Sequence, residues 1–186
     1  MRVWPDLPIR TERLTLRPVD IVDALQITRA ISSKDMVMYT LMVPFPYSVE
    51  DSIHFIMESK KALKEGTALN LAIVPQDLGE LIGVVGLMGL EPKYRKASVG
   101  YWLSKRHWGK GYVPEALNAL SDYAFGPLGL HRLEAQIFEP NIRSKRALEK
   151  AHYRYEGLMR DRYVRDGQTF NALMFSRLST DLLPPY

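Results

Sequence analysis

The sequence predicts an α+β domain, with a mixed, mostly antiparallel sheet of about six to seven strands flanked by about four helices. Runs of strand and helix periodicity follow one another in the order ββ(β)-α-β-α-ββ after two early helices. Two of these strands are joined through a helix, which indicates one parallel crossover. We expect a single domain over residues 1–186, with residues 180–186 as a loose, proline-rich tail.

The first half of the chain is expected to begin with a strand and two helices. Residues 13–18 alternate polar and apolar side chains as a strand does. Asp20 can cap a first helix, and Ser48 with Asp51 resembles a capping box before a second helix that stops at Gly66. The proline-interrupted residues 42–47 between them should form a loop. The expected inward faces are Ile21, Ala24, Leu25 and Thr28 in the first helix and Ile53, Ile56, Met57 and Leu63 in the second.

Three strands are expected next. Residues 69–74 and 81–87 are apolar runs separated by a short link, which predicts a hairpin, and residues 97–103 form a third run. The glycines at 83, 86 and 89 fall inside this strand region, so they are interpreted as bulges and not as a nucleotide-binding motif.

The second half alternates helices and strands. A helix is expected over 112–125, with Pro114 harmless in its first turn, and a strand over 132–138. A helix from 141 to 151 and two closing strands, near 153–164 and 169–178, complete the prediction.

The amino-acid composition excludes several kinds of functional site. The chain has no cysteine, which excludes disulfides, cysteine zinc sites and a covalent cysteine nucleophile, and its four histidines lack metal-ligand spacing, so no metal is expected. No run of apolar residues is long enough for a membrane span, and the N-terminus does not resemble a signal peptide, so the cytoplasm is the expected location. The formal net charge of +4 favours an anionic ligand, although solvated lysine faces are the commoner cause of such an excess.

A basic, glycine-containing loop carries the strongest functional signal. Its residues, Arg106-His107-Trp108-Gly109-Lys110-Gly111, lie between a predicted strand and a predicted helix. Glycine can adopt positive φ and lets backbone N–H groups converge on one anion, and the first amides of the helix add free donors at the positive end of its dipole. The loop lacks the Walker pattern. It therefore predicts a metal-free pyrophosphate cradle, with an ordinary basic turn as the alternative.

Several separated motifs together resemble one family. Arg106-x-x-Gly109-x-Gly111 resembles the acetyl-CoA signature of the GNAT (Gcn5-related) N-acetyltransferases. Matches to the branch of Rim-type acetylases of ribosomal-protein N-termini run through nearly the whole chain, at residues 11–17, 100–103, 108–112, 115–117, 128–133, 141–144 and 155–157. The resemblance implies a GNAT-like fold with splayed central strands, acetyl-CoA as cosubstrate, and direct transfer of the acetyl group to a primary amine.

The resemblance also assigns roles to residues. Backbone groups of Tyr101, Trp102 and Leu103 would hold the pantetheine arm. Asn141 would bind the pantetheine amide or a bridging water, with an ordinary helix N-cap as the alternative, and Ser144 would donate toward the CoA sulfur, with a small packing residue as the alternative. The remaining expected cofactor contacts come from Arg106, His107, Trp108, Gly109, Lys110, Gly111, Tyr112 and Lys145.

The chain departs from the family pattern at several positions. Leu148 stands where many members have a tyrosine acid, and His152-Tyr153 stands where Gly-Phe is usual. Ser98 and Asn171 replace two carboxylates, so the sequence identifies no general base. Glu115 is expected to support the N-terminus of its helix.

The sequence alone does not identify the amine that accepts the acetyl group. A protein N-terminal α-amine is the favoured acceptor, with a small amine such as a polyamine, amino acid or drug as the first alternative. A non-catalytic acyl-CoA or nucleic-acid-binding module is the second, although nucleic acid and membranes are not expected partners. Residues 38–42 and those near Tyr163 are candidate walls of the acceptor site, and the protein is expected as a monomer or homodimer.

Overall fold

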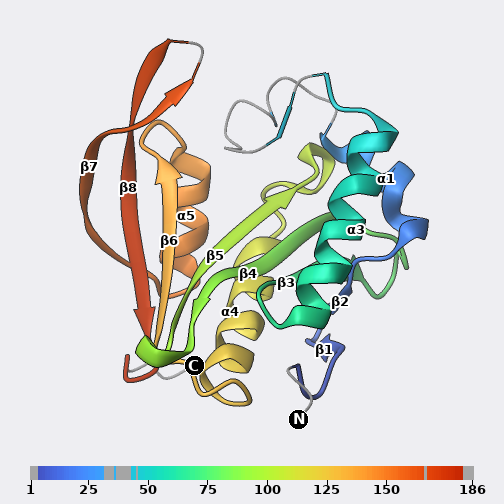
Figure 1. Cartoon of the computed structure of the whole chain (residues 1–186), viewed down its shortest axis with the longest axis horizontal. Coiled ribbons are helices and arrows are strands. Elements are labelled where there is room, and N and C mark those ends of the chain that lie inside the picture. Colours follow the sequence, from blue (N-terminus) through green and yellow to red (C-terminus); the bar gives the residue numbers. More distant parts are fainter. Residues whose placement is uncertain (1–3, 32–35, 37–42, 45, 166, 182–186) are drawn as a thin grey trace.

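A single mixed sheet organises the molecule. The computed structural model describes residues 4–31, 36, 43–44, 46–165 and 167–181. Its eight strands lie in the order β1-β2-β3-β4-β5-β6-β8-β7 (Figure 1). They are β1 (Ile9–Arg10), β2 (Leu14–Pro18), β3 (Leu69–Pro75), β4 (Gly83–Glu91), β5 (Lys96–Leu103), β6 (Arg132–Phe138), β7 (Arg154–Arg165) and β8 (Gln168–Leu178).

The predicted topology is confirmed. Every neighbouring pair is antiparallel except β5 and β6, which are parallel and joined through a helix. The sheet has one strand more than the six to seven expected, because β1 is only two residues long and too short to show a periodicity. The predicted bulge is confirmed at Gly89, where the β4–β5 register shifts between Met88 and Glu91 and φ is 57°. It is wrong at Gly83 and Gly86, which pair in regular register and lie close to the neighbouring backbone.

Four α-helices lie within the described residues, and their ends match the expected caps. They are α1 (Ala24–Ile31), α3 (Val49–Glu65), α4 (Tyr112–Phe125) and α5 (Ile142–Lys150). Asp20 caps a 3₁₀ turn (Ile21–Asp23) that leads into α1, and Ser48 forms a reciprocal capping box with Asp51 before α3. Gly66 ends α3 in the left-handed conformation, with a φ of 74°.

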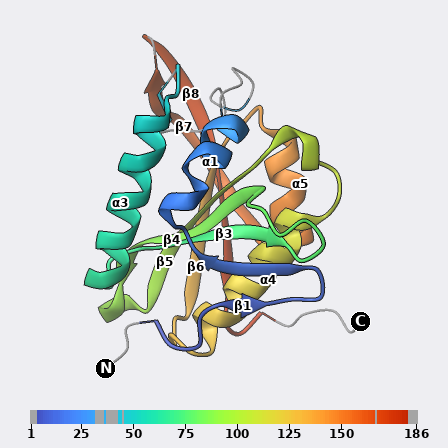
Figure 2. The ribbon, with the colours of Figure 1, turned by 90° about the vertical axis from the view of Figure 1, so that its right-hand side faces the viewer.

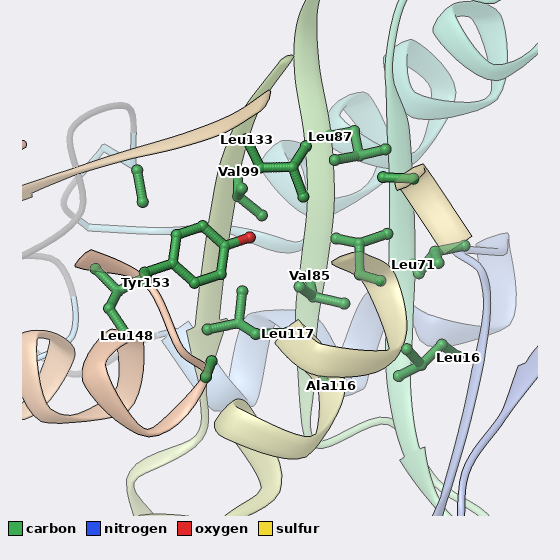
Figure 3. Close-up of a cluster of buried hydrophobic side chains, with 14 of the residues drawn as sticks. Leu16, Leu71, Val85, Leu87, Val99, Ala116, Leu117, Leu133, Leu148 and Tyr153 are labelled. Atoms are coloured by element: carbon green, nitrogen blue, oxygen red, sulfur yellow. The ribbon is translucent and has the colours of Figure 1, made fainter. Parts of the chain in front are cut away.

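The helices cover both faces of the sheet. Alternate residues of β3 point to opposite sides, with Leu71 and Ile73 in the larger core and Ala72 and Val74 in the smaller one. The larger core packs against α4 and α5, and the smaller one against α1 and α3, which lie on the opposite side of the sheet (Figure 2). Figure 3 shows the larger core, where α4 and α5 place Leu117 and Leu148 beside the strands.

Two predicted helix faces were partly wrong. In α1 the buried residues are Ala24, Ile27 and Ile31, whereas Ile21 and Leu25 are exposed. The 3₁₀ turn before α1 explains the error, because its three residues per turn shift the phase of the helix that follows.

In α3 the prediction of Ile56 is confirmed, and Ile53 and Leu63 are partly buried, but Met57 is exposed. Serines at 52 and 59 take inward positions, where Ser52 Oγ lies 2.7 Å from Thr28 Oγ1 and Ser59 Oγ accepts from Asn70 at 2.9 Å. These partners let small polar side chains replace apolar ones at the interface.

Some expectations fall wholly or partly outside the described residues. Residues 38–42, expected in the acceptor wall, lie outside them, as do residues 182–186 of the expected tail and residues 42 and 45 of the expected loop. The described residues 43, 44, 46 and 47 belong to no helix or strand.

Candidate functional site

The two parallel strands separate at the centre of the sheet. β5 and β6 pair only from Lys96 to Ser98 on one strand and from Arg132 to Glu134 on the other. Beyond these residues they diverge, as Figure 1 shows. The predicted splay is therefore confirmed, and both strands carry main-chain groups that face the opening without a strand partner.

The direction of these groups follows from the bonds at the two ends of β5. The Arg95 carbonyl accepts from Arg132 N at 3.1 Å on the β6 side, whereas Ser104 N donates to the Ile82 carbonyl at 2.8 Å on the β4 side. Because strand residues alternate in direction, the main-chain groups of Tyr101 and Leu103 face the opening. Those of Trp102 face β4, where Trp102 pairs with Val84.

The basic loop forms a group of converging amides. A 3₁₀ turn, Lys105–His107, follows β5, and Gly109 and Gly111 then adopt left-handed φ values of 78° and 81°. Within the described residues, the N–H groups of residues 109–113 have no hydrogen-bond acceptor. The last of these amides belong to the first turn of α4, where the helix dipole is positive. A bound anion would satisfy this set of donors.

Aromatic and cationic side chains hold the loop in place. The Trp108 indole Nε1 donates to the Leu103 carbonyl at 2.7 Å, and the Arg143 guanidinium lies 4.1 Å from the centre of the Trp108 ring. On the other side, Arg13 Nη1 donates to the Lys110 carbonyl at 3.1 Å, and its guanidinium lies 4.9 Å from the centre of the Tyr112 ring. The loop is thus fixed to α5 and to the segment that precedes β2, so its amides are held in place before any ligand arrives.

Glu115 links the first turn of α4 to the N-terminal strands. Its carboxylate accepts from Thr11 Oγ1 at 2.6 Å and from Arg13 Nε at 2.7 Å. Burial alone would raise the pKa of Glu115, but the hydrogen bonds from Thr11 and Arg13 outweigh it and lower the pKa. The negative charge lies where the helix dipole favours it, and the link to Arg13 is a role that the sequence did not reveal.

His107 presents a buried polar atom to the loop. Its Nδ1 is buried and has no hydrogen-bond partner among the described residues. Burial, followed by the positive charge of Lys110, lowers the pKa of His107 from 6.5, so the ring is neutral at pH 7. Arg106 and Lys110 are exposed at the same loop, where their charges can reach a bound phosphate.

The structure brings Asn141 and Ser144 together at the start of α5. The Asn141 side-chain carbonyl accepts from Ser144 N at 3.1 Å, so Asn141 is the helix N-cap that was the alternative interpretation. The Ser144 hydroxyl lies 2.6 Å from the Tyr101 hydroxyl. Lys145 Nζ lies 3.9 Å from Glu149 Oε1 along the helix, an arrangement typical of a solvated helix charge.

Two departures from the family pattern have structural explanations. Leu148 is fully buried in the larger core, where it packs as an ordinary apolar residue. His152 has a φ of 63° just after α5, a conformation that favours glycine, so it occupies a helix-terminating position. Tyr153, which follows it, is buried, and its hydroxyl lies 2.9 Å from Ser121 Oγ.

A second group of side chains, which the sequence missed apart from Tyr163, lies on β6, β7 and β8. Gln136 Oε1 accepts from Tyr163 Oη at 2.8 Å and from Arg162 Nε at 3.2 Å. Phe138 packs against the rings of Tyr163 and Phe170, with centroids 5.3 and 5.5 Å away. No spacing in the sequence connects residues of three strands, so only the fold reveals this group.

Asn171, which stands where a family carboxylate was expected, contacts a carboxylate itself. Its side-chain Nδ2 donates to Glu139 Oε2 at 2.9 Å, and its Oδ1 accepts from Asp161 N at 2.9 Å. Glu139 is exposed and directly follows β6. A carboxylate is therefore present near the end of the splayed strand, although it comes from a different element.

These features fit a diphosphate joined to an extended polar arm. The free amides of residues 109–113 suit the diphosphate, and the outward-facing main-chain groups of Tyr101 and Leu103 suit an amide-containing chain in the opening between the strands. Such a site suits the class of proteins that bind a nucleotide with a long polar arm, as in an acyl-coenzyme A. Among the described residues, no group of three histidine, aspartate or glutamate side chains could hold a metal ion.

Comparisons with known proteins agree with this class. The acetyltransferase (GNAT) domain family matches residues 13–154. An uncharacterized N-acetyltransferase, p20, of Bacillus licheniformis is 33% identical over 171 residues, which cover 92% of this chain and 96% of that protein. The chain therefore belongs to the GNAT acetyltransferases and is an N-acetyltransferase, and acetyl-CoA is the cosubstrate of this family.

Two further similarities concern the sequence and the fold. A [ribosomal protein uS5]-alanine N-acetyltransferase of Escherichia coli is 27% identical over 122 residues, covering 65% of this chain and 63% of that protein. The microcin C7 self-immunity acetyltransferase MccE, solved with acetyl-CoA and AMP, superposes with a TM-score of 0.83 at 21% identity, covering 93% of this chain and 99% of that one. The second similarity concerns the fold.

None of the described helices is long and apolar enough to cross a membrane.

Proposed function

We propose that this N-acetyltransferase acetylates the α-amine of a protein or peptide N-terminus. The observation that carries the proposal is the polar wall of Gln136, Arg162 and Tyr163 beside the opening between β5 and β6. The main chain of Gln136 lies beyond the last β5–β6 pair, so it faces the opening without a strand partner, and an extended peptide could pair with such an edge. The E. coli relative named for ribosomal protein uS5 supports the same acceptor class.

The residues of the cofactor half have distinct roles in this proposal. The amides of residues 109–113 bind the diphosphate, with Arg106 and Lys110 adding positive charge, while Tyr101 and Leu103 hold the pantetheine arm by their main chain. Because the chain has no cysteine, the amine attacks the thioester directly within a ternary complex. Ser144 donates its hydroxyl proton toward the departing sulfur.

The acceptor amine must be neutral to attack, since an ammonium group has no lone pair. An α-amino group has a pKa of about 7.7–8.0, whereas a lysine side chain has one of about 10.4. At neutral pH a sizeable fraction of α-amines is therefore neutral without a strong enzymatic base. The rate with an α-amine acceptor should rise with pH and level off above about 8.

An acceptor screen tests the proposal. Thiol release from acetyl-CoA would be measured with peptides that carry a free α-amine, with the same peptides N-terminally blocked but containing lysine, and with polyamines and single amino acids. We expect turnover with the free α-amine peptides and little with the blocked ones. Faster turnover with the small amines than with any peptide would contradict a protein acceptor while leaving the acetyltransferase activity in place.

A further inference from the structure

We propose that the Tyr101 hydroxyl is a positioning and proton-relay group, which acts through Ser144 on the sulfur that leaves acetyl-CoA. The inference rests on the proposed role of Ser144. It starts from one contact: Tyr101 Oη lies 2.6 Å from Ser144 Oγ and 3.2 Å from the Ser144 carbonyl oxygen. A single phenol thus contacts both oxygens of Ser144, the residue proposed to donate the proton.

The fold explains why these two hydroxyls meet. Tyr101 lies on β5 three residues beyond Ser98, the last residue that pairs with β6. Ser144 lies in the first turn of α5, where Asn141 caps the helix through Ser144 N. The divergence of the strands leaves room for the ring, and the cap fixes the serine, so the contact joins both sides of the opening.

The direction in which the Tyr101 hydroxyl donates determines the direction of the Ser144 hydroxyl proton. If Tyr101 donates to the Ser144 carbonyl, the serine hydroxyl can donate back to the phenol oxygen. If Tyr101 donates to Ser144 Oγ, the serine proton is directed away from the tyrosine and is available to a ligand. Burial strongly raises the pKa of Tyr101, so the phenol keeps its proton throughout the ordinary pH range.

The proton balance of the reaction is complete. The amine nitrogen forms a bond to the thioester carbon, the carbon–sulfur bond breaks, and the sulfur takes the Ser144 hydroxyl proton. Ser144 Oγ takes the phenol proton from Tyr101 as it loses its own. The acylated nitrogen releases one proton to water, and water returns one proton to the Tyr101 oxygen. No oxidant, reductant or metal is needed.

This relay accounts for the position of Leu148. The family resemblance places a tyrosine acid at that point of α5, but here the side chain is fully buried in the core. A phenol still reaches the same helix, because it comes from β5 and contacts the first turn of α5. The acid function is thus shared by two residues of different elements.

A double-mutant cycle tests the relay. In Tyr101→Phe and in Ser144→Ala, kcat should fall on the order of 100-fold, the scale of general acid catalysis, while the KM for acetyl-CoA changes by less than about two-fold. The double variant should be no slower than the slower single variant, since the two hydroxyls act as one unit. The solvent deuterium isotope effect on kcat should also be smaller in Tyr101→Phe than in the wild type.

A matched control separates the relay from packing. Tyr123→Phe removes another largely buried phenol hydroxyl, which donates to the Pro5 carbonyl at 2.7 Å and belongs to no part of the proposed site. Its kcat should equal that of the wild type. An unchanged kcat in Tyr101→Phe, or single effects that multiply fully in the double variant, would overturn the relay. The assay uses whichever amine the acceptor screen finds fastest, so failure of the peptide proposal would leave this test intact.

Discussion

The two sides of the proposed active site are built from different parts of the polypeptide. The proposed cofactor side consists mainly of main-chain groups from one stretch, residues 101–113, with two left-handed glycines near its C-terminal end. The acceptor side consists of side chains from β6, β7 and β8, which are linked by hydrogen bonds such as those to Gln136 and Asn171. A ligand common to a family can be bound by backbone geometry, whereas a particular acceptor needs particular side chains.

The same difference appears in what supports each side. The loop is held by Trp108 and Arg13, which bond to carbonyls of Leu103 and Lys110 and leave the amides available. The base of the acceptor half is held by charged side chains, with Arg132 between Glu134 and Glu156. We therefore expect glycine substitutions in the loop to weaken cofactor binding most. Low pH should destabilise mainly the acceptor half.

The largest effect is expected at Gly111. Gly111→Val would place a β-branched residue at a φ of 81°, and its Cβ would lie 3.4 Å from Arg13 Nη2. The backbone should shift out of the left-handed region, so the amides would no longer converge. Calorimetric titration should show acetyl-CoA binding weakened by at least about 100-fold, which corresponds to roughly 2.7 kcal/mol.

Gly79→Val provides the control for backbone strain. Gly79 has a φ of 68°, nothing lies within 4 Å of its added Cβ, and it belongs to the β3–β4 connection and not to the loop. Its variant should lose stability but bind acetyl-CoA as the wild type does. Equal affinity in the Gly111 and Gly79 variants would contradict a loop whose function depends on its left-handed glycines.

A smaller effect is expected in acid, at the base of the acceptor half. Hydrogen bonds from Arg132 and Ser176 lower the pKa of Glu156 from 4.5 to about 2. Because folding lowers the pKa of Glu156, its carboxylate stabilises the fold at pH values above its ordinary pKa of 4.5. This contribution is lost as the pH falls from 4.5 to about 2. Because Glu156 is 38% exposed, solvent screening should reduce the loss to about 1 kcal/mol.

The Glu156→Gln variant checks this acid dependence. Chemical denaturation of the wild type should give an unfolding free energy that falls with acid more steeply than that of the variant over this pH range. Parallel pH dependences in the two proteins would show that the Arg132 pair does not support the acceptor half. Acetyl-CoA affinity at neutral pH should be the same in both, since Glu156 lies outside the loop.

The sequence predicted the elements that have local signals. The bounds of α4 and β6, the caps at Asp20, Ser48 and Gly66, and the parallel crossover follow from periodicity and cap chemistry, which act over a few residues. Its errors arose where tertiary packing decides, as in the exposure of Met57 and Leu25 and in the burial of two serines of α3. Neither a 3₁₀ turn nor a polar partner on another helix can be predicted from the spacing of apolar residues.

The same limit applies to the site. The loop was recognisable because its glycines and basic residues are contiguous, and Ser144 because it lies three residues from Asn141. The contact between Tyr101 and Ser144 joins residues 43 positions apart, and the pair of Glu139 and Asn171 joins residues 32 apart. No local sequence pattern predicts such contacts, because the tertiary fold makes them: α5 approaches β5 in the first case, and β6 pairs with β8 in the second.

Backbone amide NMR tests the central claim, that main-chain N–H groups of the loop bind the diphosphate of CoA. The ¹⁵N-labelled protein would be titrated with CoA and, in parallel, with pantetheine, which lacks the diphosphate. The account predicts that CoA shifts the amide resonances of Gly109 and Gly111 strongly and that pantetheine leaves them in place while perturbing Tyr101 and Leu103. Saturating CoA that left the Gly109 and Gly111 amides unshifted would contradict it.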